Sequence, residues 1–303
     1  MDTFLAVSAA SSYHELLRGY ADSWLQQGCT RPEWCVLGME GGAPLVRAAL
    51  WAQPGQSVPT DLVLLDADWT DHDLSAGRAL LSEVHARARS LGADSLHHHV
   101  DSPPGPPQYQ ERDEERVRLI TGSGYELLRD GLRWLWSAGP ADGGASQPSL
   151  TFRTLAEVGE DAFIAAMAST YEGTLDTWIA RRVDELGRAK AARSDFLEYQ
   201  TLEHRPEWWE LASTGEDELV GVVMAARNPS SAVIAYVGVV PAQRGRGLAE
   251  ELVRRGMRRL VSDGASEIRG DCDQENVGMV KAFERAGFTR VARRRTYQVR
   301  LVR

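Results

Sequence analysis

The sequence predicts an α/β fold built on mixed sheets and arranged as two similar halves. Three observations support this prediction. A nearly continuous apolar stretch at 232–240 precedes an amphipathic helical pattern, which is typical of a buried strand followed by a helix. The first half shows the same order of patterns in a weaker form. Residues 137–149, which lie between the halves, contain almost no side chain that belongs in a core.

The second half has the clearer patterns. We expect its elements in this order: helices over 157–167 and 175–186, strands over 208–212, 218–227 and 232–240, a helix from 248, a strand over 268–272, a helix over 276–286 and a final strand or hairpin over 290–302. The strand at 232–240 has so few polar residues that we expect both of its faces to be buried.

The first half repeats part of this order. Strands are predicted over 34–39 and 44–52, where Glu-Gly-Gly-Ala forms the turn, and over 61–67, with a helix over 79–91. A repeated structural unit explains this similarity. We therefore expect a first domain over 1–137, a linker over 138–149 and a second domain over 150–303.

Composition excludes several classes of function. The chain has 303 residues and a formal net charge of −9, which argues against a general nucleic-acid binder. Its start lacks the pattern of a signal peptide, and its apolar runs are too short to span a bilayer. The 3 cysteines have no metal-ligand spacing, and the odd count suits a reducing compartment. We expect a cytoplasmic protein, monomeric or homodimeric, without nucleic-acid or membrane partners.

A run of three histidines, 97–99, is the other possible metal motif. Neighbouring residues of a strand point to opposite faces, so these three cannot bind one ion together. No metal site is predicted.

The loop between the apolar strand and the amphipathic helix, 239–249, combines glycines with arginines. Gly245 and Gly247 allow a backbone approach to an anion, and Arg244 and Arg246 add positive charge. Because the first N–H groups of a helix lack partners, this loop has the parts of a phosphate cradle. A glycine-rich turn with solvated arginines is the alternative.

The same loop resembles the coenzyme A signature of the GCN5-related N-acetyltransferases (GNATs). That signature has Gln or Arg, then Gly three residues later, then Gly or Ala, and here Arg244, Gly247 and Ala249 hold those places. Downstream, residues 276–288 resemble the second signature of the family, a helix that opens with Asn and ends in Gly-Phe. The match covers about 150–303, and the first half resembles the same fold, which implies two tandem GNAT-like domains.

The resemblance implies acetyl-CoA as co-substrate and assigns residues to it. The backbone at Gly238, Val239 and Val240 is expected to pair with the pantetheine arm. Asn276 would contact that arm, and Phe283 would pack near the thioester. N–H groups of the loop would hold the pyrophosphate, namely those of Arg244, Gly245, Arg246, Gly247, Leu248 and Ala249.

The corresponding turn of the first half, 71–77, has two aspartates and a serine in place of donors and the close-approach glycine. Carboxylates repel a phosphate. A proline-rich segment, 101–107, replaces the start of the second signature. We therefore expect the first half to keep the fold, to have lost acetyl-CoA binding, and to shape the acceptor site or mediate assembly.

Candidates for acid–base catalysis are few. Many family members place a tyrosine acid where this chain has Phe283, and Tyr297 is the nearest alternative. The thiolate is also able to leave unprotonated, because a thiol has a pKa of about 8.5. Glu172 and Asp271 are candidate bases, as is Asp273, and Cys272 ranks lower as an acyl carrier because no histidine is near it in sequence.

The resemblance implies an acetyl-CoA-dependent N-acetyltransferase that acts on a primary amine of a small molecule by direct attack. One alternative is a transferase for another acyl-CoA or for an acceptor other than an amine. A second alternative is a CoA-binding regulatory or scaffold protein without turnover, which the phenylalanine at 283 favours.

Overall fold

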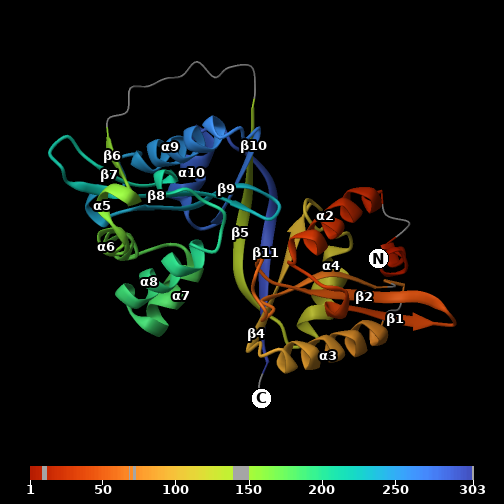
Figure 1. Cartoon of the computed structure of the whole chain (residues 1–303). Helices are drawn as coiled ribbons and strands as arrows, with labels where there is room; N and C mark the ends of the chain where they lie inside the picture. The colour runs from red at the N-terminus through yellow and green to blue at the C-terminus, as the bar shows by residue number, and fades with distance from the viewer. Residues whose placement is uncertain (9–11, 68, 71–72, 139–149, 302–303) are drawn as a thin grey trace. The chain divides into compact units, whose positions relative to one another are not determined.

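The computed structural model describes residues 1–8, 12–67, 69–70, 73–138 and 150–301 (Figure 1). These residues form two compact units. The first unit comprises Met1–Asp130 and Ala292–Arg303, and the second comprises Gly131–Val291. Apart from Ala138, the linker expected at 138–149 lies outside the described residues.

The first unit is a sheet with helices on its faces. Its helices are α1 (Asp2–Leu5), α2 (His14–Gln27), α3 (Ser75–Ser90) and α4 (Asp113–Thr121), and its strands are β1 (Cys35–Glu40), β2 (Ala43–Trp51), β3 (Asp61–Ala67), β4 (Ser95–Ser102) and most of β11 (Thr289–Arg300). The strand order is β1-β2-β3-β4-β11. Only β3 and β4 are parallel neighbours among these pairs.

The core of the first unit has two parts. One cluster joins α3 and α4 to the strands, with Leu81, Val84 and Leu119 among its fully buried side chains. A second cluster joins α1 and α2 to β2 and β3, with Leu5 and Trp24 at its centre. The sheet is therefore covered by helices on both faces, as expected for a parallel pair at its middle.

The second unit has the same plan. Its helices are α5 (Leu155–Val158), α6 (Glu160–Thr170), α7 (Thr177–Leu186), α8 (Arg188–Tyr199), α9 (Leu248–Ser262) and α10 (Val277–Arg285), and its strands are β6 (Thr151–Thr154), β7 (Trp209–Ser213), β8 (Leu219–Asn228), β9 (Ser231–Val239), β10 (Glu267–Asp273) and most of β5 (Glu126–Ser137). The order is β5-β10-β9-β8-β7-β6, and only β9 and β10 are parallel neighbours among these pairs.

Two groups of helices cover β8 and β9 from opposite sides, α6–α8 from one and α9 from the other (Figure 1). On the α6 side the rings of Phe163, Phe196 and Trp209 pack together, with centroids 5.5–6.1 Å apart. On the α9 side Leu252 packs with Val220 and Val223. The amphipathic pattern of α9 is explained by this one-sided packing.

The mixed α/β fold and the repeated order of elements are confirmed. Sequence patterns missed α2, α4 and α8. The apolar residues of α8 are few, whereas α2 buries Leu17, Ala21 and Trp24 at helical spacing, a pattern that was overlooked. The expectation that the strand at 232–240 is buried on both faces is wrong in part. Buried and half-buried residues alternate along β9, and its last residues, 237–239, are half-buried.

The compact units do not follow the boundary expected from composition. Residues 131–137 of β5 pair with β10 in the second unit, and β11 pairs with β4 in the first. Each half of the sequence therefore supplies the strand that lies beside the central parallel pair of the other unit. Among the described residues, no helix is both long enough and apolar enough to cross a bilayer.

Candidate functional site

The central parallel strands of the second unit separate after a short stretch of pairing. β9 is paired with β10 at Ala232 and Val233. Beyond these residues β9 keeps its pairing with β8, and β10 keeps its pairing with β5. We call residues 234–239 of β9 and 270–273 of β10 the second-unit fork. One edge of β9 is thus turned toward the fork rather than toward a neighbouring strand.

Val239 directs its backbone groups into this fork. The N–H of Val240 donates to the carbonyl of Val220 in β8, at 2.9 Å. Because backbone groups alternate between the two edges of a strand, the N–H of Val239 faces away from β8. The carbonyl of Val239 on that edge accepts from Nε of Arg244 at 3.0 Å. The fork therefore offers a directed N–H donor at its inner edge.

A β-bulge turns Tyr236 toward α6. Tyr236 and Ile234 lie opposite consecutive residues of β8, so Ala235 is the extra residue. A bulge reverses the face on which the following side chains lie. Ile234 packs against α9, whereas the hydroxyl of Tyr236 lies 2.6 Å from that of Thr170, at the end of α6.

Gly238 makes this contact possible. A Cβ atom at Gly238 would lie 2.3 Å from the Tyr236 hydroxyl oxygen and 2.6 Å from Oγ1 of Thr170. Only a residue without a side chain allows both hydroxyls to approach the backbone here. The two hydroxyls therefore lie over β9 at Gly238.

The loop from Val240 to α9 presents its N–H groups as the sequence predicts. Gly245 and Gly247 have φ angles of +78° and +79°, and Gly247 directly precedes α9. Within the described part of the chain, no acceptor takes the backbone N–H groups of residues 245–249. Unpaired N–H groups and the dipole of a 15-residue helix give this loop a positive potential.

The two arginines of the loop have different environments. Arg244 donates to three carbonyls, those of Val239 and Gly173 at 3.0 Å and that of Thr170 at 2.9 Å. Its backbone N–H donates to Pro241 at 3.2 Å. Arg244 therefore ties the loop to the end of α6, a role that the sequence did not indicate. Arg246 donates to Oε1 of Gln243 and is exposed.

Arg285 is a cationic residue that the sequence patterns did not identify. It is exposed at the end of α10, and its NH1 lies 3.9 Å from the position of a Cβ on Gly247. No motif marks this residue, because its nearness to α9 depends on how α9 and α10 pack together. Arg246 and Arg285 are thus cationic side chains near the start of α9, whose first turn also holds Glu250 and Glu251.

Phe283 and Asn276 both have structural contacts. Phe283 is 2% exposed, and its ring stacks on Trp134 with centroids 5.7 Å apart. The same ring covers Gly270 of the fork, where a Cβ would lie 2.5 Å from it. Asn276 caps α10 by accepting from the N–H of Met279 at 3.3 Å.

The candidate bases lie in different places. Glu172 is exposed and forms an ion pair with Arg188. Asp271 lies 3.4 Å from Nε of Arg133. Asp273 is buried and accepts from the N–H of Thr177, at the start of α7, at 2.6 Å.

Two other candidates are enclosed in cores. Sγ of Cys272 is buried and accepts from Nε1 of Trp134 at 3.3 Å, which places it in the hydrophobic cluster of the second unit. Tyr297 is 4% exposed in the core of the first unit, opposite His98 in the β4–β11 pairing. Tyr297 therefore belongs to the first unit, whereas the second-unit fork belongs to the other unit.

A cluster of tyrosines beside the fork was missed. Tyr236 lies within 6.1 Å of Tyr171 and Tyr199, measured between ring centroids. Burial raises the pKa of all three hydroxyls. Tyr171 donates to Oδ2 of Asp195 at 2.6 Å, and Asp195 is paired with Arg182. Tyr236 was the available signal, because it is the one polar side chain between Ala232 and Val240.

The direction of one hydrogen bond follows from the others. Thr170 has a single hydroxyl hydrogen and donates it to the carbonyl of Met167 at 2.7 Å. The hydrogen between Tyr236 and Thr170 must then come from Tyr236. The oxygen of Tyr236 keeps lone pairs but has no second hydrogen to donate.

Comparison with known proteins identifies this part of the chain. The model of the acetyltransferase (GNAT) family matches residues 169–288, which include the fork, the loop and α10. Mycothiol acetyltransferase of Corynebacterium efficiens is 36% identical over 83 residues. That match spans 27% of this chain and 28% of the relative.

Solved structures share the fold over nearly the whole chain. A GCN5-related N-acetyltransferase from Sphaerobacter thermophilus has a TM-score of 0.58 and 19% identity, covering 97% of this chain and 87% of that one. A tandem GNAT protein from the clavulanic acid biosynthesis pathway has a TM-score of 0.54 and 16% identity, covering 99% and 93%. At these identities the likeness concerns the fold alone.

Proposed function

Through residues 169–288 this chain is a member of the acetyltransferase (GNAT) family, and from that premise we propose an acetyl-CoA-dependent N-acetyltransferase. Its acceptor is a primary amine of a small molecule. The observation that carries the proposal is the continuity of two features. The inward N–H of Val239 and the unpaired N–H groups of residues 245–249 lie on one short stretch of backbone.

The backbone from Val239 to residue 249 has groups that could bind two parts of acetyl-CoA, the diphosphate and the pantetheine arm. The N–H groups at the start of α9 would hold the diphosphate, assisted by the exposed guanidinium groups of Arg246 and Arg285. Of the stretch 238–240, the backbone at Val239 faces the fork, and this edge of β9 would pair with the pantetheine arm as an added strand does. The side-chain amide nitrogen of Asn276 would contact the arm while its oxygen caps α10.

The chemistry requires few protein groups. The amine nitrogen attacks the thioester carbon, an N–C bond forms, the C–S bond breaks, and CoA leaves as a thiolate. The N–H of Val239 would stabilise the oxyanion. The thiolate needs no acid partner, because its conjugate thiol has a pKa of about 8.5. This accounts for a phenylalanine at 283.

The proton of the amine has to reach solvent. Glu172 is the best placed of the sequence candidates, because it follows the Thr170 turn that Arg244 holds and is exposed. Asp271 faces Arg133, and Tyr297 lies in the first unit. We therefore propose that Glu172 accepts the proton, directly or through water.

Tyr236 has a different role in this proposal. Its oxygen lies over Gly238 with lone pairs only, so it suits an N–H of the incoming amine. Accepting one N–H would turn the nitrogen lone pair of a neutral amine toward the thioester. Tyr236 is thus proposed to orient the acceptor rather than to transfer a proton.

Release of free CoA on addition of a panel of primary amines tests the function. We expect release with the wild type and its loss in Gly247→Asp, whose carboxylate would stand at the proposed diphosphate site. Tight binding of acetyl-CoA without release for any amine would favour a regulatory protein, which the buried Phe283 also allows. Release with thiols or alcohols only, or with another acyl-CoA only, would identify the other alternative.

The location and assembly proposed for the chain follow its composition. Cys29, Cys35 and Cys272 form no disulfide, which suits the cytoplasm. We propose that the chain acts there as a monomer or homodimer. Sedimentation of the purified protein at several concentrations decides between these two states.

A further inference from the structure

The first unit contains a fork in the same place as the second. β3 is paired in parallel with β4 at Asp61, opposite His97. Beyond this pair β3 continues beside β2 and β4 continues beside β11. We call residues 62–67 of β3 and 98–102 of β4 the first-unit fork. The side chains that bond to the strand edges differ between the first-unit fork and the second-unit fork.

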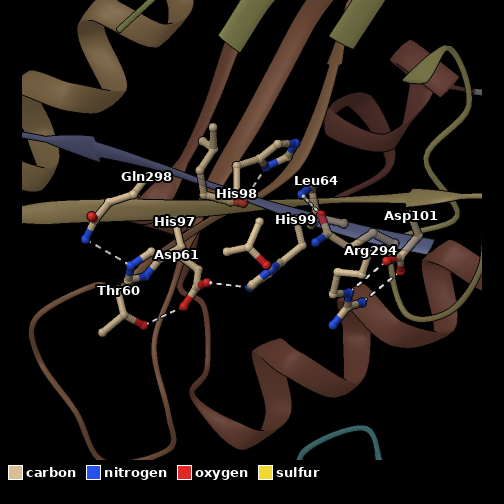
Figure 2. A network of polar contacts seen from close by, with 12 residues as sticks. Thr60, Asp61, Leu64, His97, His98, His99, Asp101, Arg294 and Gln298 are labelled. Atoms are coloured by element: carbon tan, nitrogen blue, oxygen red, sulfur yellow. Dashed lines mark hydrogen bonds and ion pairs between the residues drawn. The ribbon is translucent and has the colours of Figure 1, made fainter. Parts of the chain in front are cut away.

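His98 fills the first position of this fork. Its side chain is fully buried, and Nδ1 lies 2.8 Å from the carbonyl oxygen of Leu62. Figure 2 shows His98 between His97 and His99. Burial lowers the pKa of His98 to about 3, so the ring is neutral. Since a carbonyl only accepts, Nδ1 carries the hydrogen and Nε2 is left as an acceptor. That acceptor faces Nε2 of Gln110 at 3.5 Å.

Gln108 fills the next position. Its Oε1 accepts from the backbone N–H of Leu64 at 2.9 Å and from Nε2 of Gln110 at 2.8 Å. Both glutamines belong to the segment 103–112, which connects β4 to α4. Leu64 has a φ angle of 53°, so β3 is irregular at the residue whose N–H is taken.

Arg116, in the first turn of α4, is the third side chain that hydrogen-bonds to the backbone of β3. Its guanidinium donates to the carbonyl of Leu65 and, at 2.9 Å, to that of Glu111. The side chain is 1% exposed and stacks over Trp69, with Cζ 4.9 Å from the ring centroid. The carbonyl of Glu111 lies in the same connecting segment. Arg116 therefore fastens that segment to β3.

Three polar groups of β3 thus have side-chain partners, namely the carbonyl of Leu62, the N–H of Leu64 and the carbonyl of Leu65. Groups of this kind on the fork edge are those that an added extended ligand would need. In the second unit, the N–H of Val239 faces the fork and has no partner among the described residues, although the carbonyl of Val239 accepts from Nε of Arg244. In the turn 71–77, which the sequence marks as unfavourable for a phosphate, residues 71 and 72 lie outside the described residues, whereas Asp73 and Ser75 are described.

We propose that the segment 108–116 is a built-in occupant of the first-unit fork, and that this chain binds one acyl-CoA rather than two. His98, Gln108 and Arg116 make the hydrogen bonds with β3 that a pantetheine arm would otherwise make. The stoichiometry rests on the proposed function of the second unit. The occupancy of the first fork does not.

Calorimetric titration of the full chain with CoA tests the stoichiometry. The wild type should bind one molecule, and Gly247→Asp should bind none. Two molecules per wild-type chain, or one retained by Gly247→Asp, would overturn the proposal. If the wild type binds no CoA, the proposed function of the second unit is wrong. The amide-exchange experiment described next then tests the occupant of the first-unit fork by itself.

Amide hydrogen exchange at Leu64 tests the occupant directly. We expect protection in the wild type and at least a tenfold loss of it in Gln108→Ala, because the acceptor is gone. Gln108→Glu keeps the acceptor and should keep the protection. Gln26→Ala, at an exposed position of α2, is the matched control and should change nothing.

Unchanged protection at Leu64 in a folded Gln108→Ala protein would overturn the proposal. If Gln108→Ala fails to fold, Gln108→Asn supplies the second variant, because it keeps the amide but shortens its reach by one methylene. Loss of protection at Leu64 in a folded Gln108→Asn supports the occupant. Full protection in that variant contradicts it.

Discussion

The hydroxyl of Tyr236 donates to that of Thr170 across 2.6 Å, and Thr170 in turn donates to the carbonyl of Met167. This chain of two hydrogen bonds ends at a backbone carbonyl, which has no proton to exchange. It therefore fixes the phenol and leaves its lone pairs directed away from α6. This arrangement supports the proposed role of Tyr236, which is to orient the acceptor rather than to transfer a proton.

Replacing Tyr236 by Phe removes this acceptor while keeping the ring. We expect kcat for the best amine to fall by about tenfold, roughly the worth of one well-placed hydrogen bond, with little change in the KM for acetyl-CoA. Steady-state kinetics with each substrate varied in turn measures both constants. Thr170→Ser keeps the hydroxyl and is the control, whereas an unchanged kcat in Tyr236→Phe would exclude the proposed role.

Arg244 is expected to act through geometry rather than charge. Its planar group serves three carbonyls on two different segments, which a lysine ammonium cannot reach from one position. Arg244→Lys should therefore weaken acetyl-CoA binding about as much as Arg244→Gln, by about tenfold. Calorimetry of both variants provides the comparison. Near-wild-type affinity in Arg244→Lys would mean that the positive charge alone matters.

Introducing a hydroxyl at position 283 tests whether an acid partner is missing there. Phe283→Tyr adds a hydroxyl at Cζ, the end of the ring that lies against Gly270, and residue 283 is only 2% exposed. We expect a loss of about 1–3 kcal/mol in the free energy of unfolding and no gain in kcat. Urea unfolding and the CoA-release assay measure the two effects. A rise in kcat would show that protonation of the thiolate limits the reaction.

The stability of the first unit should depend on pH through its buried imidazoles. Burial lowers the pKa of His98 to about 3 and that of His85 to about 4, against about 6.5 in an unfolded chain. Below pH ~6.5 the unfolded state binds more protons, so stability falls as the pH falls. Each histidine contributes a limiting slope of about 1.4 kcal/mol per pH unit.

Urea unfolding at about pH 7.5 and about pH 5, followed by amide exchange in β3, measures this dependence. His98→Gln keeps a donor for the carbonyl of Leu62 but does not titrate, so its stability should change less between the two conditions. An equal change in the variant and the wild type would locate the pH dependence elsewhere.

Much of the fold was predictable because local signals agree with tertiary packing. The strand at 61–67 coincides with β3, and the one-sided pattern from Leu248 coincides with α9. The left-handed glycines of the loop were also predictable, since a strand that turns into a helix at Gly247 requires that conformation. These features depend on residues that are close together in sequence.

What was missed depends on contacts between distant segments. The three carbonyl partners of Arg244 come from α6, from the turn after it and from β9, and no sequence pattern joins them. Arg285 approaches Gly247 only through the packing of α10 on α9. Tyr297 was a plausible acid by position in the chain, but strand pairing places it opposite His98 in the first unit.

The pairing of β11 with β4 also sets an order of events during synthesis. Asp101 and Arg294, which bond at 2.7 and 2.8 Å in the first unit, are 193 positions apart. While a ribosome makes the intervening residues, β4 lacks this neighbour and exposes an unpaired edge. The first unit therefore cannot complete its sheet cotranslationally in the usual N-to-C order, and fragments cut at 138–149 would each lack a strand that the missing fragment provides.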